Sequence, residues 1–372
     1  MSAPRVRFDR GPLGTGTAFK NARRVITATS PDEVPQAFVD LQDAQGQGHW
    51  LAGFASYELG YLMSRKLVGL LPEVRQLPLL QFGVFDDPVA VEPLKGGRAE
   101  LTSPLPMWSR DRYARAFEVV HEYIKAGDVY QANLTFPMQA QLTGTPEALY
   151  AALCARQSVP YGALVQLGGP ALLSRSPELF FSLSAKGKLT ARPMKGTAPR
   201  GHTSAEDDAL RDALATSEKN RAENLMIVDL LRNDLSRISQ IGSVRVPELF
   251  QVERYATLHQ MTSRITAQIN DGTSIAELFR ALFPCGSITG APKIRAMEIL
   301  RDLEAGPRDG YCGAIGWIAP DGAMEFNVAI RTLMCGEDGS VSMNVGGGVV
   351  YDSTAEDEYD EALLKAKFAD LN

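Results

Sequence analysis

Residues 341–365 read VSMNVGGGVVYDSTAEDEYDEALLK and contain both kinds of element from which we expect the fold to be built. Apolar and polar residues alternate over residues 341–345, which predicts a β-strand that ends at the glycines Gly346, Gly347 and Gly348. Ser353-Thr354-Ala355-Glu356 has the spacing of a capping box, so a C-terminal helix is expected to begin there.

Strands and helices also mix along the rest of the chain, without the regular alternation of a doubly wound sheet. This pattern predicts an α+β fold of antiparallel sheets covered by helices. We expect strands over residues 24–28, 79–85, 129–141 and 162–183, and helices over residues 31–44, 109–126, 205–239 and 294–302. The helix over 205–239 is predicted to be continuous, because Val228, Leu231, Leu235 and Ile238 recur at helical spacing.

Two regions are expected within one body. Residues 1–100 show short strands with turns, and residues 108–372 show a denser pattern of strands and helices that we expect to form the main domain. Between them, residues 92–106 contain Gly96-Gly97 and three prolines, which predicts a loop or linker.

The composition excludes several classes of protein. The chain has 372 residues with a net charge of −6 and no basic block, which argues against a nucleic-acid partner. No uncharged apolar run reaches the ~20 residues of a membrane helix, and the first residues lack the apolar core of a secretory signal. Four separated cysteines without a CxxC motif make a reduced cytoplasm the simplest compartment. An acidic enzyme that binds a polyanion needs a metal ion or a few placed basic residues.

The C-terminal helix offers such groups. Glu358, Glu361 and Lys365 are spaced i, i+3 and i+7, so they share one helix face. A surface ion pair between Glu361 and Lys365 is the simpler interpretation, and it is favoured when nothing else is considered. Two carboxylates close after three glycines also suit Mg²⁺, which keeps waters and substrate oxygens in its coordination shell.

A lysine and a glutamate stand out in the middle of the chain. Residues 193–201 read PMKGTAPRG, which predicts a rigid turn around Lys195 with exposed backbone N–H groups. Glu178, 17 positions earlier, could act as a general acid if an apolar pocket raised its pKa. Taken alone, the simpler interpretation is favoured for both, namely a basic surface turn at Lys195 and a solvated strand edge at Glu178. Glu223 could belong to a solvent-facing helix surface.

Several motifs occur together, in an order that resembles the chorismate-utilising enzymes from Trp108 to the end of the chain. They are Gly127-Asp128-Val129-Tyr130-Gln131-Ala132-Asn133, Ser176-Pro177-Glu178, the Lys195 turn, Ala222-Glu223-Asn224, Asp229-Leu230-Leu231-Arg232-Asn233-Asp234-Leu235, Leu258-His259-Gln260-Met261, Thr289-Gly290-Ala291-Pro292-Lys293, Ala329-Ile330-Arg331-Thr332, the triple glycine and residues 358–365. The resemblance implies two packed antiparallel sheets flanked by helices. Pro-Met-Lys-Gly-Thr at residues 193–197 is most similar to the aminodeoxychorismate branch, in which a lysine stands where the anthranilate and isochorismate branches carry alanine.

The resemblance also implies a role for each residue. Lys195 would be the nucleophile and Glu178 the general acid, with His259 as a base or orienting group. Glu223, Glu358 and Glu361 would hold Mg²⁺ against the ring carboxylate of chorismate. The substrate would be bound by Gly196, Thr197, Tyr311, Arg331, Gly346, Gly347, Gly348 and Lys365.

The reaction implied is a transaminase-type amination of chorismate at C4, which supplies 4-aminobenzoate and folate synthesis. Cys285 is followed by Gly286 but belongs to the Thr289-Gly290 motif, so we see no glutaminase elbow. We therefore expect ammonia to arrive free or from a separate glutamine amidotransferase subunit. The alternatives are an anthranilate synthase large subunit, an isochorismate or salicylate synthase, and a catalytically silent chorismate-binding subunit.

Overall fold

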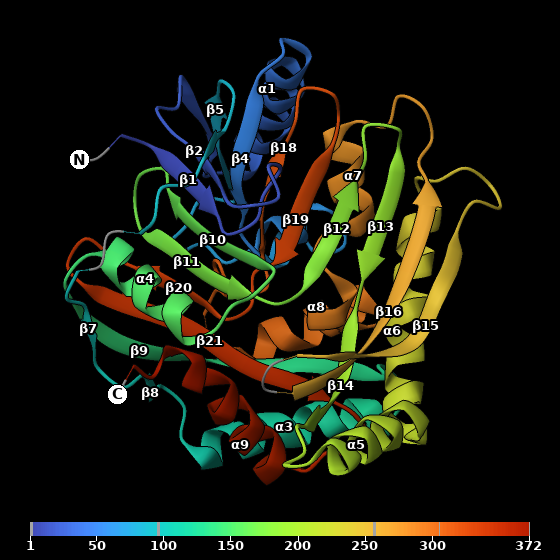
Figure 1. Ribbon diagram of the computed structural model, residues 1–372. Helices are drawn as coiled ribbons and strands as arrows, with labels where there is room; N and C mark the ends of the chain where they lie inside the picture. Colours follow the sequence, from blue (N-terminus) through green and yellow to red (C-terminus); the bar gives the residue numbers. More distant parts are fainter. Residues whose placement is uncertain (1–2, 95–96, 256–257, 305, 372) are drawn as a thin grey trace.

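The protein is described by a computed structural model that covers residues 3–94, 97–255, 258–304 and 306–371. Two antiparallel sheets pack against each other, and helices cover their outer faces (Figure 1). The predicted α+β class, with two packed antiparallel sheets, is thus confirmed.

The first sheet carries the triple glycine. Its strand order is β17 (Gly290–Ala291), β9 (Gln131–Thr143), β21 (Ser340–Val349), β20 (Thr332–Cys335), β11 (Ala171–Ser176), β10 (Tyr161–Gln166), β1 (Arg5–Phe8), β2 (Thr17–Phe19) and β6 (Val89–Ala90), with β7 (Glu100–Leu101) and β8 (Leu105–Pro106) paired to β9.

The second sheet carries Lys195 at one end. Its order is β14 (Met194–Pro199), β16 (Leu258–Gln268), β13 (Lys188–Arg192), β12 (Leu179–Leu183), β19 (Met324–Val328), β18 (Ala314–Ile318), β4 (Trp50–Ala55), β5 (Leu80–Phe85) and β3 (Arg24–Ala28), with β15 (Arg245–Arg254) paired to β16. Strands from residues before position 100 therefore lie in both sheets.

Apolar residues between and outside the sheets explain the layers. Phe19, Phe54, Val165 and Ile315 belong to a buried cluster between the two sheets. The second sheet packs its other face on α1 (Val34–Gly46), α6 (Glu218–Ser236) and α7 (Ile275–Leu282). The first sheet packs on α3 (Arg110–Lys125), α4 (Pro146–Arg156), α8 (Lys293–Leu303) and α9 (Ala355–Ala366). The remaining helices are α2 (Leu59–Leu62), α5 (Ser204–Thr216) and the short η1 (Pro31–Glu33), η2 (Val68–Leu70), η3 (Gly286–Ile288) and η4 (Lys367–Ala369).

The predicted continuous helix over residues 205–239 is wrong, because the chain forms α5 and α6 with a break at Ser217. Ser217 adopts an extended conformation, with φ −62° and ψ 113°, and its side chain accepts a hydrogen bond from the backbone N–H of Asn220. This local bond gives the backbone an alternative to the helix and caps α6. The apolar stripe of α6 is buried as predicted.

The strand predicted to end at the triple glycine instead continues through it to Val349. Gly346, Gly347 and Gly348 pair with Thr135, Leu134 and Asn133 of β9. A Cβ on Gly346 would lie 2.2 Å from the Leu134 carbonyl oxygen, so the close approach of the strands requires glycine there.

Two further predictions need correction near the ends of elements. The cap of α9 is Thr354, whose side chain accepts from the backbone N–H of Asp357, so the capping residue is one position later than expected. Residues 92–106 were predicted to be a loop, but β7 and β8 lie within them. Lys95 and Gly96 of this segment lie outside the described residues.

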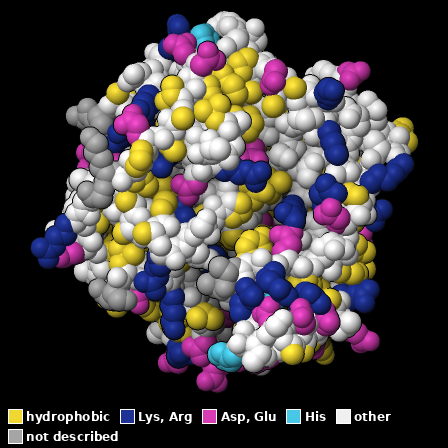
Figure 2. Space-filling model, in the orientation of Figure 1, with side chains coloured by type: hydrophobic (Ala, Val, Ile, Leu, Met, Phe, Trp, Pro, Cys, Tyr) yellow, Lys and Arg dark blue, Asp and Glu magenta, His cyan; other side chains and the backbone are white. Residues whose placement is uncertain are grey.

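The surface and the helices fit the composition. On the face shown in Figure 2, lysines and arginines lie beside acidic side chains and do not form one continuous basic surface. In the described part of the chain, no helix has both the length and the apolar character needed to cross a bilayer.

Candidate active site

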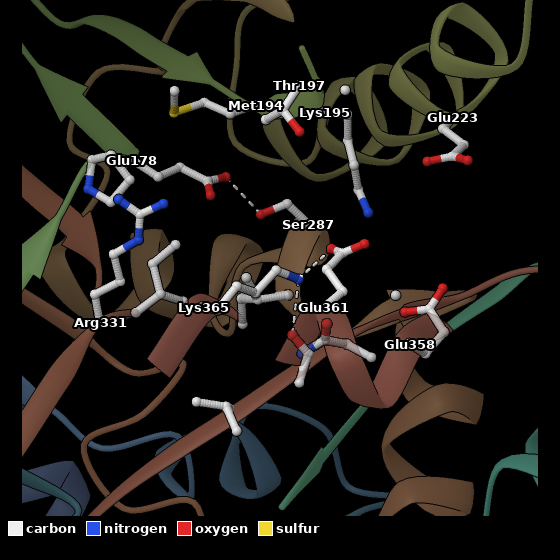
Figure 3. Close-up of a pocket in the computed structure, with 18 of the residues that line it drawn as sticks. Glu178, Met194, Lys195, Thr197, Glu223, Ser287, Arg331, Glu358, Glu361 and Lys365 are labelled. Atoms are coloured by element: carbon white, nitrogen blue, oxygen red, sulfur yellow. Dashed lines mark hydrogen bonds and ion pairs between the residues drawn. The ribbon is translucent and has the colours of Figure 1, made fainter. Parts of the chain in front are cut away.

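A pocket of about 390 Å³ opens where the β14 end of one sheet meets β9 and β21 of the other, beside α6 and α9. It brings together residues that are far apart in the sequence (Figure 3). Those expected from the sequence are Glu178, Lys195, Gly196, Thr197, Glu223, Tyr311, Arg331, Gly346, Gly348, Glu358, Glu361 and Lys365.

Lys195 reaches this pocket from a bulged edge strand and not from the predicted turn. β14 pairs with β16, and the register shifts between Met194 and Thr197. Gly196 has φ +83°, a left-handed conformation that glycine adopts without strain. The bulge turns the Lys195 side chain into the pocket, where burial lowers the pKa of its ammonium group.

Glu178 lies directly before β12 and is 5% exposed, so it is not a solvated edge residue. The Ser287 hydroxyl donates a hydrogen bond to Glu178 Oε1 over 2.8 Å. Burial raises the pKa of Glu178 to about 7, although the Ser287 bond and the nearby Lys195 charge oppose the shift. A carboxyl group with this pKa can carry and release a proton near neutral pH.

Arg331 lies beside Glu178 on one side of the pocket (Figure 3). Its φ of +50° is rare for a residue with a side chain, and such conformations are often found at functional sites. Among the described residues its guanidinium makes no hydrogen bond or close ion pair, and burial lowers its pKa. The group is therefore free to bind a carboxylate with two parallel N–H donors.

The three glutamates expected to hold a metal line the other part of the pocket. Glu358 accepts a hydrogen bond from Ser353 over 2.7 Å, and Glu361 pairs with Lys365 over 2.7 Å. Burial and the charge of Glu361 raise the pKa of Glu358. For Glu361, burial opposes ionisation, but Lys365 outweighs it and lowers the pKa.

These carboxylates fit a hard cation that is completed by other oxygens. A Cβ on Gly347 would lie 2.5 Å from Glu358 Oε2, so the glycine leaves room for this carboxylate. Over the ranges that the structure covers, no three acidic, histidine or cysteine side chains form a ready-made metal cluster. Mg²⁺ is commonly bound by one or two carboxylates together with water and substrate oxygens, so the donor set is compatible with it.

His259 is not brought into the pocket. It is fully buried, with Nε2 2.8 Å from Asp207 Oδ1, and Asp207 also pairs with Arg200. Successive side chains of a strand point to opposite faces, so it is Gln260 that lines the pocket. Its Nε2 donates to the Gly196 carbonyl oxygen over 2.8 Å and supports the bulge.

Sequence reasoning gave no functional role to several other lining residues. They include Ser287, Gln260, Lys219, Asn220 and Asn344. Ser287 lies two residues before the motif Thr289–Lys293, but only the packing of η3 against the residue that precedes β12 shows its contact with Glu178. Gly347 is the expected substrate-binding residue that does not line the pocket, because its open face lies against Glu358.

Known proteins are similar to this chain over most of its length. A family described as chorismate binding enzyme matches residues 95–370. The chain is 36% identical to aminodeoxychorismate synthase component 1 of Escherichia coli K12, over 97% of this chain and 89% of that protein. It is 46% identical to aminodeoxychorismate synthase of Streptomyces griseus over 69% of this chain, which is 35% of that longer protein.

Solved structures show the same fold. Anthranilate synthase component I of Streptococcus pneumoniae TIGR4 superposes with a TM-score of 0.78 at 24% identity, over 99% of this chain and 90% of that one. The menaquinone-specific isochorismate synthase MenF of Escherichia coli gives 0.77 at 18% identity, over 100% and 88%. With the family match covering most of its length, this chain belongs to the chorismate binding enzyme family.

Proposed function

We propose that this chain is component I of an aminodeoxychorismate synthase and converts chorismate and ammonia into 4-amino-4-deoxychorismate, for 4-aminobenzoate and folate synthesis. One observation carries the proposal: Lys195 and Glu178 share a pocket in which the pKa of the lysine is lowered and that of the glutamate is raised. Environments that push two pKa values in opposite directions are typical of a nucleophile and an acid.

Chorismate brings two carboxylates, which must be neutralised in a chain of net charge −6. Arg331 binds the enolpyruvyl carboxylate through its planar guanidinium. Backbone groups of Gly196, Thr197, Gly346 and Gly348, with Tyr311 and Lys365, complete the cradle around the substrate.

Glu223, Glu358 and Glu361 are the residues that would hold Mg²⁺ against the ring carboxylate. When bound, the ion supplies positive charge that neutralises this carboxylate and polarises the ring. The raised pKa of Glu358, caused by burial and by its like-charged neighbour, supports a cation at this position.

The protein side chains exchange the C4 substituent in two displacements. The neutral amine of Lys195 adds at C2, the two ring double bonds shift, and the C4 hydroxyl leaves as water after Glu178 protonates it. Ammonia then adds at C4, the double bonds shift back, and Lys195 leaves from C2. The net reaction replaces the hydroxyl with an amine and releases one water, in the manner of a transaminase-type transferase.

The ammonia is supplied by a separate glutamine amidotransferase subunit in the cytoplasm. Support comes from relatives that are named component 1, a name that implies a further component. The four cysteines are free thiols, consistent with a reducing compartment.

The direct test is incubation of the purified chain with chorismate, MgCl₂ and an ammonium salt. Mass spectrometry should detect an aminated product that a 4-aminobenzoate-forming lyase converts to 4-aminobenzoate. Lys195→Ala should abolish this product. Formation of anthranilate or isochorismate by the parent chain would contradict the proposal and indicate one of the other family reactions.

A further inference from the structure

Gln131, the first residue of β9, has a buried side chain with no partner. It is fully buried, and neither Oε1 nor Nε2 of its amide has a hydrogen-bond partner among the described residues. Burying both polar ends of an amide without partners is costly, so such a group in a native structure needs an explanation.

The side-chain amide of Gln131 and the side-chain amine of Lys195 both lie close to Gly348. A Cβ on Gly348 would lie 2.9 Å from Gln131 Nε2 and 3.0 Å from Lys195 Nζ. Both atoms therefore lie about 3 Å from the same point, and a methyl group placed there would crowd the ends of both side chains. Within the described ranges, Nζ makes no hydrogen bond or ion pair of its own.

Charged groups on several elements affect the protonation of the Lys195 amine. Among the described residues, none of them forms a hydrogen bond that would fix the orientation of the amine. Glu223 on α6, Glu178 before β12 and Glu358 on α9 favour the ammonium form, whereas Lys365 disfavours it. Gln131 adds an uncharged group that can accept a hydrogen bond, and rotation about its last side-chain bond exchanges the oxygen and nitrogen without moving other atoms.

We propose that Gln131 is a positioning residue for Lys195: its amide oxygen accepts a hydrogen bond from Nζ across the gap left by Gly348 and directs the amine toward the substrate. The inference rests on the proposed function, which makes Lys195 the nucleophile. The inference also requires glycine at position 348, because a side chain there would separate the Gln131 amide from the Lys195 amine.

The test compares Gln131→Met, which keeps the length and removes the amide, with Gln131→Glu, which adds a charge. Gly348→Ala inserts the methyl group between the partners. Gln139→Met is the matched control, since Gln139 is exposed on the same strand. Each folded variant is labelled with trace acetic anhydride over a range of pH, and acetylation of Lys195 is followed by peptide mass spectrometry without chorismate.

In Gln131→Glu the labelling midpoint of Lys195 should rise by roughly one pH unit, because an anion replaces a neutral acceptor. In ammonia-free incubations with chorismate, Gln131→Met and Gly348→Ala should form the Lys195 adduct about ten- to a hundredfold more slowly, since a misdirected nucleophile reacts poorly. The KM for chorismate should stay near the parent value in Gln131→Met, and the Gln139 variant should behave as the parent.

Unchanged labelling midpoints together with parent adduct rates in the Gln131 variants would overturn the inference, even if their melting temperatures fell. If the parent itself forms no adduct, the proposed function fails. The labelling arm then still decides whether Gln131 contacts Lys195, because it requires no substrate.

Discussion

The Ser287 hydroxyl affects the pH range over which Glu178 can act as an acid. Its hydrogen bond stabilises the ionised form of Glu178 and so opposes the burial that raises the pKa to about 7. Because the proposed acid must be protonated to act, activity should fall as the pH rises through this value.

Ser287→Ala should therefore raise the pKa of Glu178 further and move the alkaline limb of kcat/KM to higher pH by roughly one unit. A pH–rate profile with ammonium as the nitrogen source gives the measurement, and Ser236→Ala on α6 serves as an exposed serine control. An alkaline limb that stays in place would mean that another group supplies the proton.

Arg331 offers a second test at this scale. Arg331→Lys keeps the positive charge and tolerates the +50° φ about as well as arginine, but it loses the two-pronged contact with a carboxylate. We expect the KM for chorismate to rise about ten- to a hundredfold, the equivalent of losing one charged hydrogen bond. Steady-state kinetics at saturating Mg²⁺ measure this, and an unchanged KM would make Arg331 structural.

At the scale of elements, α9 and β21 form one functional unit. The open glycine strand lets α9 approach closely, which places Glu358 against Gly347 and allows Lys365 to donate to the Gly346 carbonyl oxygen over 3.0 Å. Because Glu361 and Lys365 are partly exposed, their ion pair adds little stability, and the helix face is available for ligands.

Glu361→Gln should consequently impair metal use more than folding. We expect the Mg²⁺ concentration for half-maximal activity to rise about ten- to a hundredfold, while the melting temperature without metal changes little. Glu356→Gln, on the exposed first turn of the same helix, is the control. Full activity of Glu361→Gln in the presence of a chelator would remove Glu361 from the metal site.

The same elements show what the sequence can and cannot predict. The helix predicted over residues 109–126 matches α3, and the strand over 24–28 matches β3, because their signals are local patterns and a serine cap. The apolar periodicity that predicts a continuous helix lies wholly after Ser217, so it carries no signal for the break at that residue. Three glycines predict the end of a strand by turn propensity, whereas pairing with β9 continues the strand through them.

Site residues that belong to a recognisable sequence motif could be predicted from the sequence. Lys195, Glu178 and Arg331 do line one pocket. The sequence motif bearing His259 was identified, but neither its strand nor the face that each of its residues occupies was predicted, and Gln260 lines the pocket where His259 was expected. Contacts such as those of Ser287 and Gln131 depend on how elements far apart in the sequence pack.

At the scale of the whole molecule, the proposed function makes this chain one component of a two-component enzyme. The purified chain should make product with free ammonium but not with glutamine alone. Adding a separate glutaminase subunit should allow glutamine to replace ammonium, and product formation by liquid chromatography measures both. Glutamine-dependent product from this chain alone would contradict the division of labour.

The central claim is that Lys195 attacks the substrate, and intact-protein mass spectrometry after incubation with chorismate and Mg²⁺ without ammonia tests it most directly. An unperturbed lysine with a pKa near ~10.4 is almost wholly protonated at neutral pH, so the lowered pKa in this pocket is a requirement of the account. The account predicts a substrate adduct on the parent chain that maps to Lys195 by peptide analysis, is lost when ammonium is added and is absent from Lys195→Ala. No adduct on the parent, together with C4 amination by Lys195→Ala at the parent rate, would contradict it.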